Sequence, residues 1–201
     1  MFITFEGGEG SGKTTIINSL NNFLASLQHQ VVLTREPGGT RIGEKIRDII
    51  LDAQNIDIDP YTESILFAAS RAQHLKEVII PALQAGKIVI CDRFLDSSIA
   101  YQAYARHLGL DFVLKVNNLA LQYQPDITFY IDLDPIIGLK RISTRDKLDR
   151  LDRAQLEFHQ KVRAGYLTLA KDNPQRIIII DGNQSKEQIA RLVIAHIQGL
   201  F

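Results

Sequence analysis

The chain has 201 residues, of which 45% are hydrophobic and 23% are charged, and this length and usage suit one globular domain, residues 1–201, with a well-buried core. The composition excludes disordered, collagen-like and low-complexity chains. Because 23 Lys+Arg balance 23 Asp+Glu, the net charge of zero predicts no nucleic acid or membrane partner, so any anion site would have to be local.

Five short apolar runs recur along the chain and predict strands. Within each run the apolar residues are near-continuous rather than alternating with polar ones, which suits a parallel sheet that is covered on both faces. Several of them end in an acidic residue. The runs are residues 2–6, 31–34, 88–92, 127–132 and 177–181.

Amphipathic helices are predicted between these strands. Apolar residues recur at helical spacing over 16–27 and, after Thr40, over 42–50. A capping-box pattern at Ser185 opens a last helix with an apolar stripe over 189–197. Strand alternating with helix predicts an α/β fold with a doubly wound, five-stranded parallel sheet, whose ligand binds beyond the carboxyl ends of the strands.

The segment GGEGSGKT, residues 7–14, lies directly between the first predicted strand and the first predicted helix. It fits the G-x-x-x-x-G-K-[ST] phosphate-binding loop (P-loop), in which backbone N–H groups and a helix N-terminus surround phosphate oxygens. The alternative is a glycine turn that only joins strand to helix. We expect a nucleoside triphosphate here, with Lys13 on its β and γ phosphates and the Thr14 hydroxyl on Mg²⁺. The predicted nucleotide-binding residues are Gly7, Gly8, Glu9, Gly10, Ser11, Gly12, Lys13, Thr14 and Thr15.

A P-loop leaves two classes open, a nucleotide-controlled switch and a phosphotransferase with a second substrate. A GTPase switch needs the guanine-reading Asn-Lys-x-Asp, and no Asn-Lys dipeptide occurs in this chain. A phosphotransferase needs positive charge around the migrating group. Asp92 and Arg93 come at the end of the central predicted strand. We expect Asp92 to hold Mg²⁺ through water and Arg93 to bind a phosphate between donor and acceptor, with a surface salt bridge as the alternative.

Phe67 and Arg71 are four residues apart on a predicted helix, so they share one face. A ring beside a guanidinium could stack on a base and hydrogen-bond its edge. Taken alone, Phe67 suits a core position and Arg71 a solvated one. Arg47, on the helix that follows Thr40, is equally ambiguous on its own.

Residues 140–153 (KRISTRDKLDRLDR) hold six basic and three acidic residues without glycine or proline. One interpretation is a solvated helix hairpin. The other is a lid whose Arg145 or Arg150 moves onto the phosphates, which would exclude water and suppress hydrolysis.

The cysteine and histidine content argues against a disulfide and a zinc site. The single cysteine, Cys91, lies in an apolar run and is predicted to be a small buried hydrophobe in a reducing, cytoplasmic protein. The five histidines have no pair at ligand spacing. No apolar stretch has the length of a membrane span, and the N-terminus lacks the basic start of a signal peptide.

Four blocks in this order resemble the bacterial thymidylate kinase family along essentially the whole chain. They are FEGGEGSGKTT (5–15), TREPGGT (34–40), LFAASR (66–71) and CDRFLDSSIAYQ (91–102). The resemblance implies transfer of the γ-phosphoryl group of ATP to dTMP, with Mg²⁺ and without a general base. The lid and the last helix match more loosely.

The resemblance also implies roles for individual residues. Glu9 would accept a hydrogen bond from the deoxyribose 3′-hydroxyl, and Tyr101 would crowd the sugar's 2′ position. Phe67 would stack on thymine, and Arg71 would bond its O4. Arg47 and Arg93 would hold the acceptor phosphate, and the positions that match base contacts are Ser97, Ser98 and Gln102.

In this family the catalytic arginine lies either in the P-loop or in the lid. Position 10 is glycine, so the resemblance assigns the arginine to the lid, with Arg145 favoured and Arg150 second, beside Lys13 and Arg93. The family also implies a homodimer. The alternative is another P-loop nucleoside or nucleoside-monophosphate kinase.

Overall fold

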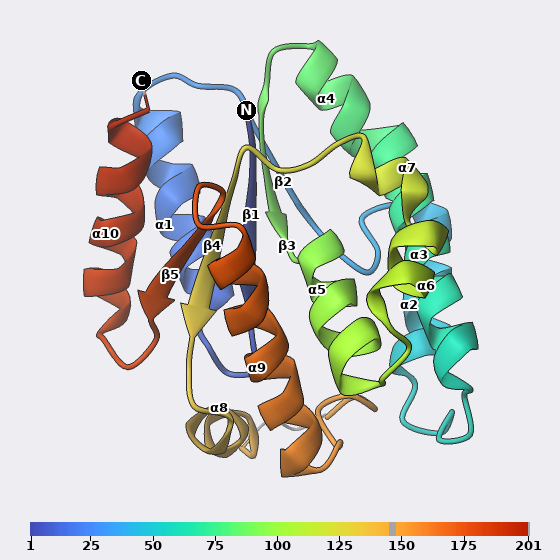
Figure 1. Ribbon diagram of the computed structural model, residues 1–201. Coiled ribbons are helices and arrows are strands. Elements are labelled where there is room, and N and C mark those ends of the chain that lie inside the picture. The colour runs from blue at the N-terminus through green and yellow to red at the C-terminus, as the bar shows by residue number, and fades with distance from the viewer. Residues whose placement is uncertain (145–147, 201) are drawn as a thin grey trace.

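The computed structural model describes residues 1–144 and 148–200, and its centre is a parallel sheet (Figure 1). The strand order β2-β3-β1-β4-β5, with every neighbouring pair parallel, confirms the predicted doubly wound five-stranded sheet. Each strand lies on one of the predicted apolar runs. The strands are β1 (Phe2–Gly7), β2 (Val31–Arg35), β3 (Ile88–Asp92), β4 (Ile127–Asp132) and β5 (Ile177–Asp181).

Helices connect the strands and cover both faces. Thr40 caps α2 by accepting a hydrogen bond from Gly43 N–H, and Ser185 and Gln188 form the predicted capping box of the last helix. The α-helices are α1 (Lys13–Ser26), α2 (Arg41–Leu51), α3 (Pro60–His74), α4 (Ile80–Gln84), α5 (Leu95–Ser98), α6 (Leu110–Val116), α7 (Asn118–Leu121), α8 (Pro135–Ile142), α9 (Leu156–Asp172) and α10 (Lys186–Gln198). Two π-helical segments continue α3 and α5, and these are η1 (Leu75–Ile79) and η2 (Ile99–Ala105).

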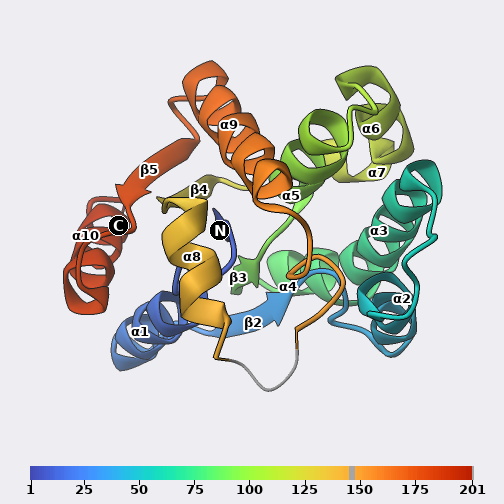
Figure 2. The ribbon, with the colours of Figure 1, turned by 90° about the horizontal axis from the view of Figure 1, so that it is seen from below.

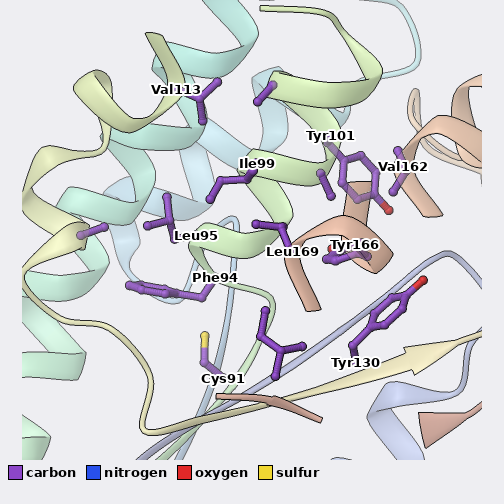
Figure 3. Close-up of a cluster of buried hydrophobic side chains, with 14 of the residues drawn as sticks. Cys91, Phe94, Leu95, Ile99, Tyr101, Val113, Tyr130, Val162, Tyr166 and Leu169 are labelled. Carbon is purple, nitrogen blue, oxygen red and sulfur yellow. The ribbon is translucent and has the colours of Figure 1, made fainter. Parts of the chain in front are cut away.

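Successive residues of a strand point to opposite faces, so each strand contributes to two cores. In β1, Ile3 and Phe5 pack with the apolar stripes of α1 and α10, which lie together on one side of the sheet (Figure 1). Phe2 belongs to the other core, which α9, α5 and η2 cover. Figure 3 shows that second core, in which the Tyr130 and Tyr166 rings stack with their centroids 4.8 Å apart. Cys91 lies in it and is fully buried, as predicted.

All five carboxyl ends meet at one edge of the sheet because the strands are parallel. That edge carries the P-loop at the end of β1 and the Asp92-Arg93 pair at the end of β3, and α8 crosses it (Figure 2). A ligand site is therefore expected where β1 and β3 end side by side.

The described residues of the segment, 140–144 and 148–153, do not form the helix hairpin that charge patterning allowed. Helix α8 ends at Ile142, residues 148–155 have no helical structure, and α9 starts at Leu156. Arg145 lies outside the described residues. Nowhere in residues 1–144 and 148–200 is a helix both long and apolar enough to cross a bilayer.

Candidate active site

The P-loop turns tightly between β1 and α1. Gly10 and Gly12 adopt positive φ, at 69° and 88°, and α1 begins at Lys13. Lys13 Nζ donates to the Gly7 and Gly8 carbonyls at 3.1 and 3.2 Å, so its ammonium group lies over the loop. The pKa of Lys13 is lowered, first by burial and then by the charge of Arg93. This is the geometry that phosphate binding requires.

The backbone of Gly10 lies directly against that of Gly138 in α8. A Cβ at position 10 would collide with the Gly138 carbonyl oxygen, and a Cβ at position 138 would collide with the Glu9 carbonyl. The absence of an arginine in this P-loop therefore has a packing reason, because the loop has no room for a side chain at Gly10.

A cavity of about 480 Å³ begins at the P-loop and extends between α2, α3 and η2. It brings together most of the residues that the sequence singled out. Those in its lining are Glu9, Gly10, Ser11, Gly12, Lys13, Thr14, Thr15, Arg47, Phe67, Asp92, Arg93, Ser97, Ser98, Tyr101 and Gln102. It is also lined by residues to which the sequence gave no role, including Arg35, Glu36 and Asp149. Gly7, Gly8, Arg71 and Arg150 are not part of the lining.

Glu9, Arg93 and Tyr101 form one cluster at the mouth of the P-loop. Glu9 Oε1 accepts from Arg93 Nη2 at 2.7 Å and from the Tyr101 hydroxyl at 2.9 Å. Burial alone would raise the pKa of Glu9, but the charges of Arg93 and Lys13 lower it to about 2. The Arg93 guanidinium also lies 5.2 Å from the centre of the Tyr101 ring. The cluster places a permanent anion beside the cations that surround the loop.

Glu6, to which the sequence analysis gave no role, supports the loop that carries Arg93. Its buried carboxylate accepts from Phe94 N–H at 2.8 Å, Ser97 Oγ at 2.6 Å and the Tyr166 hydroxyl at 2.7 Å. Arg93 itself has a positive φ of 69°, a conformation that L residues rarely adopt. Desolvation raises the pKa of Glu6 to about 7. An acidic residue inside an apolar strand was the signal that could have identified it.

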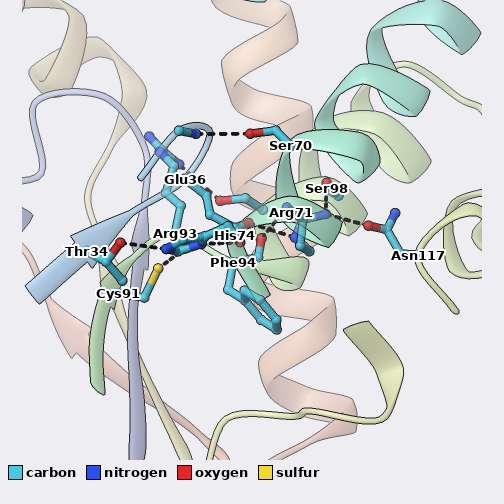
Figure 4. Close-up of polar contacts among 12 residues, drawn as sticks. Thr34, Glu36, Ser70, Arg71, His74, Cys91, Arg93, Phe94, Ser98 and Asn117 are labelled. Carbon is cyan, nitrogen blue, oxygen red and sulfur yellow. Dashed lines mark hydrogen bonds and ion pairs between the residues drawn. The ribbon is translucent and has the colours of Figure 1, made fainter. Parts of the chain in front are cut away.

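Arg71 is deeply buried rather than solvated, with 2% of its surface exposed. Four of its five N–H groups donate within the protein (Figure 4). Their acceptors are Glu36 Oε2 at 2.7 Å, Ser98 Oγ at 2.9 Å, Asn117 Oδ1 at 2.6 Å and the Phe94 carbonyl at 3.0 Å. Arg71 therefore retains one N–H that no described residue accepts.

Arg35 and Arg47 bring two further guanidinium groups to the lining of the cavity. Arg47 donates to the Pro37 carbonyl at 2.8 Å, and its pKa is lowered first by burial and then by the charge of Arg35. Arg35 pairs with the exposed Glu44 carboxylate. Since two guanidinium groups repel each other here, an anion between them would be stabilised.

Asp92 and Thr14 suit a magnesium ion, which prefers oxygen ligands. Asp92 Oδ1 is buried, and no hydrogen bond reaches it from any residue in 1–144 or 148–200. An orphaned carboxylate oxygen is costly unless a cation or water pairs with it. Thr14 lines the same cavity at the start of α1.

Arg150 does not line the cavity and instead contacts residues of α2 and α3. Its Nη2 lies 2.6 Å from Glu63 Oε2, and its Nε donates to the Ile50 carbonyl at 2.9 Å. Asp149, Leu151 and Asp152 on either side do line the cavity. In this arrangement Arg150 ties the segment before α9 to α2 and α3.

Comparisons with known proteins agree with this arrangement. The family model described as thymidylate kinase matches residues 5–193. The thymidylate kinase of Acholeplasma laidlawii is 53% identical over 199 residues, covering 98% of each chain. That of a Geobacillus strain is 50% identical and covers 96% of this chain and 94% of the relative. The crystal structure of thymidylate kinase from Ehrlichia chaffeensis superimposes with a TM-score of 0.81 at 38% identity, over 98% of both chains. The resemblance seen in the sequence is thereby confirmed, and the chain belongs to the thymidylate kinase family.

Proposed function

We propose that this chain transfers the γ-phosphoryl group of ATP to dTMP, giving dTDP and ADP. One observation supports the roles that we assign to individual residues in this reaction. A single cavity joins the P-loop to Phe67, Tyr101 and Gln102, so a nucleotide donor and a pyrimidine acceptor could meet end to end. Residues 1–201 would form one P-loop kinase domain, with a lid at about 140–153.

An oxygen of the dTMP phosphate attacks the γ-phosphorus, and the bond to the β-bridging oxygen of ATP breaks, leaving ADP. The attacking oxygen already carries negative charge, so no general base is needed. Catalysis then consists of alignment and charge neutralisation. Lys13 would neutralise the donor phosphates, and Arg93 would lie between donor and acceptor.

Magnesium would be held by the Thr14 hydroxyl and, directly or through water, by Asp92. When bound, it neutralises charge on the donor phosphates. An arginine from the lid would be the last of the cations around the transferring phosphoryl group. Arg145 and Arg150 were predicted for this role, and the contact of Arg150 with Glu63 favours Arg145.

On the acceptor side, Arg47 and Arg93 would bind the dTMP phosphate, and Glu9 the 3′-hydroxyl. Phe67 would stack on thymine, and Arg71 would use its remaining N–H for O4. Tyr101, fixed by its bond to Glu9, would exclude a 2′-hydroxyl. Ser97 and Ser98 would complete the base pocket, although their hydroxyls already bond Glu6 and Arg71.

We also propose a homodimer formed through α2 and α3, and a cytoplasmic location, where ATP is available. Both helices expose large apolar side chains that a partner could cover. These are Ile42, Ile49, Tyr61 and Ile65. Light scattering of the wild type and of an Ile65→Asp variant tests the assembly, because only a dimer through this face would dissociate.

An ADP-release assay tests the function directly. ATP and Mg²⁺ are supplied with dTMP, dUMP, UMP, CMP, AMP, GMP or thymidine in parallel. We expect a strong preference for dTMP. Activity confined to thymidine, or to a purine nucleotide, would instead support the alternative of another P-loop kinase and overturn the assignment of the base pocket.

A further inference from the structure

Glu63, on α3, is a buried carboxylate beside the acceptor end of the cavity. Its side chain is 1% exposed, yet it receives hydrogen bonds from three residues that lie far from it in the sequence. Oε1 accepts from Gln102 Nε2 at 3.0 Å and Arg106 Nε at 3.3 Å. Oε2 accepts from Arg106 Nη2 at 3.1 Å and Arg150 Nη2 at 2.6 Å.

These four bonds occupy the acceptor capacity of one carboxylate. Burial alone would raise the pKa of Glu63, but the charge of Arg106 and the bonds from Arg150 and Gln102 lower it. The group is therefore ionised at neutral pH, and an ionised carboxylate can only accept hydrogen bonds.

This fixes the orientation of the Gln102 amide. An amide has a donor end and an acceptor end, and only the NH₂ end can face an ionised carboxylate. The carbonyl oxygen of Gln102 must then face away from Glu63. Gln102 is 1% exposed and lines the cavity together with Phe67 and Ser98, so the cavity is the ligand-accessible space beside its side chain.

We propose that Glu63 is a positioning residue that sets the hydrogen-bond polarity of the base pocket. It holds Gln102 with the carbonyl oxygen toward the acceptor base. A carbonyl there accepts from the N3–H of thymine or uracil and opposes cytosine, whose N3 is itself an acceptor. This inference rests on the proposed function, and it adds selection between pyrimidine classes by a residue that does not touch the substrate.

The test compares Glu63→Gln with the wild type, using dTMP, dUMP and dCMP as acceptors. Without the negative charge, the Gln102 amide can turn over. We expect kcat/KM for dTMP and dUMP to fall about tenfold, mainly through KM, as for one lost hydrogen bond. The value for dCMP should be unchanged or rise, and the KM for ATP should not change.

Arg106→Gln is the matched control. It removes one partner of the same carboxylate, and with it the contact of Arg106 with the Phe158 ring, but leaves Glu63 facing Gln102. We expect Arg106→Gln to lose about as much folding stability as Glu63→Gln. The ratio of dTMP to dCMP turnover should nevertheless stay at the wild-type value. If Glu63→Gln folds and keeps that ratio within about twofold of the wild type, the proposal is wrong.

A measurement on the wild-type chain decides the question if Glu63→Gln does not fold. In nuclear magnetic resonance spectra of the dTMP complex, the Gln102 NH₂ protons should show contacts to Glu63 protons. NH₂ protons that instead contact the base would overturn the proposed orientation. A wild type that does not phosphorylate dTMP would refute the proposed function itself, whereas normal dTMP use with an unchanged variant would refute only the role of Glu63.

Discussion

Arg93 Nη2 lies 2.7 Å from Glu9 Oε1, so the end of β3 is tied to the P-loop by an ion pair whose side chains are 16% and 19% exposed. Glu9 is thereby an anion inside a loop that binds anions. Its position beside Tyr101 agrees with a contact to the acceptor sugar rather than to the phosphates of ATP.

We predict that Glu9→Gln raises the KM for dTMP more than the KM for ATP. The carboxamide keeps the shape but loses the charge that pairs with Arg93. The pKa of Glu9 is about 2. The stability that ionised Glu9 gives the folded chain is therefore fully present above the ordinary carboxylate pKa and is lost only as the pH falls toward 2. The increase in the KM for dTMP caused by Glu9→Gln should therefore be the same at every pH between about 6 and 8. Steady-state kinetics check it, with Glu157→Gln, which removes an exposed ion pair with Lys161, as the control.

Arg93→Ala and Lys13→Ala should abolish turnover without unfolding the chain. Each variant would lose a cation that we propose to lie around the transferring phosphoryl group, and such cations are worth roughly 10³-fold or more in rate. Turnover and thermal unfolding are measured together. Exposed Arg191→Ala serves as a control for loss of charge alone. Near-normal turnover in a folded Arg93→Ala or Lys13→Ala protein contradicts the assignment of that residue.

Glu6 gives the folded state a specific pH dependence. Burial raises its pKa from 4.5 to about 7, so the folded chain binds this proton more tightly than the unfolded chain. The stabilisation is complete below the unfolded pKa and is lost as the pH rises through 7. The free energy of unfolding of the wild type should therefore fall by a contribution on the order of 2 kcal/mol between about pH 5 and 8. We predict that Glu6→Gln removes this contribution.

Urea unfolding of the wild type and the variant at several pH values measures this difference. Other carboxylates, such as Glu9 and Asp132, have lowered pKa values and act in the opposite direction. The quantity to compare is therefore the difference in free energy of unfolding between the wild type and the variant at each pH. Parallel curves for wild type and variant would show that Glu6 does not titrate in this range.

Gly10→Ala should destabilise the fold, whereas Gly8→Ala should not. A side chain at position 10 would meet both a positive φ of 69° and the Gly138 carbonyl, but a Cβ at Gly8 would have no neighbour within 4 Å. The left-handed conformation and the collision together should cost about 2 kcal/mol or more. Chemical denaturation of both variants checks the contrast, and equal stability of the two would contradict the packing explanation.

Asp92→Asn should raise the Mg²⁺ concentration needed for half-maximal turnover. The carboxylate oxygen that receives no hydrogen bond within the described residues would be replaced by a weaker ligand. Titration of activity with Mg²⁺ at saturating ATP gives the shift, and it should be larger than the change in the KM for dTMP. An unchanged Mg²⁺ requirement would remove Asp92 from the proposed metal site.

The sheet and the P-loop could be predicted because their signals are local. Apolar runs at 2–6 and 88–92 specify buried strands, and the glycine and lysine spacing at 7–14 specifies a phosphate loop wherever it joins a strand to a helix. These patterns need no knowledge of distant residues, and the structure places them as expected.

The buried polar network could not be predicted in this way. Arg71 looks solvated in its own helix, but its partners Glu36, Ser98 and Asn117 come from three other segments. The same holds for Glu63, whose partners lie 39 to 87 residues away. Contacts of this kind depend on tertiary packing, and helical spacing does not encode them.

The four hydrogen bonds of Arg71 have an entropic consequence for ligand recognition. With four of its N–H groups already engaged, its guanidinium is held in place by the protein before any ligand arrives. An arginine that was free in solvent would lose up to about 2 kcal/mol of rotamer entropy on binding. Here that ordering occurs during folding. A base that takes the remaining N–H therefore meets a preorganised donor and gains the hydrogen bond without first having to immobilise the side chain.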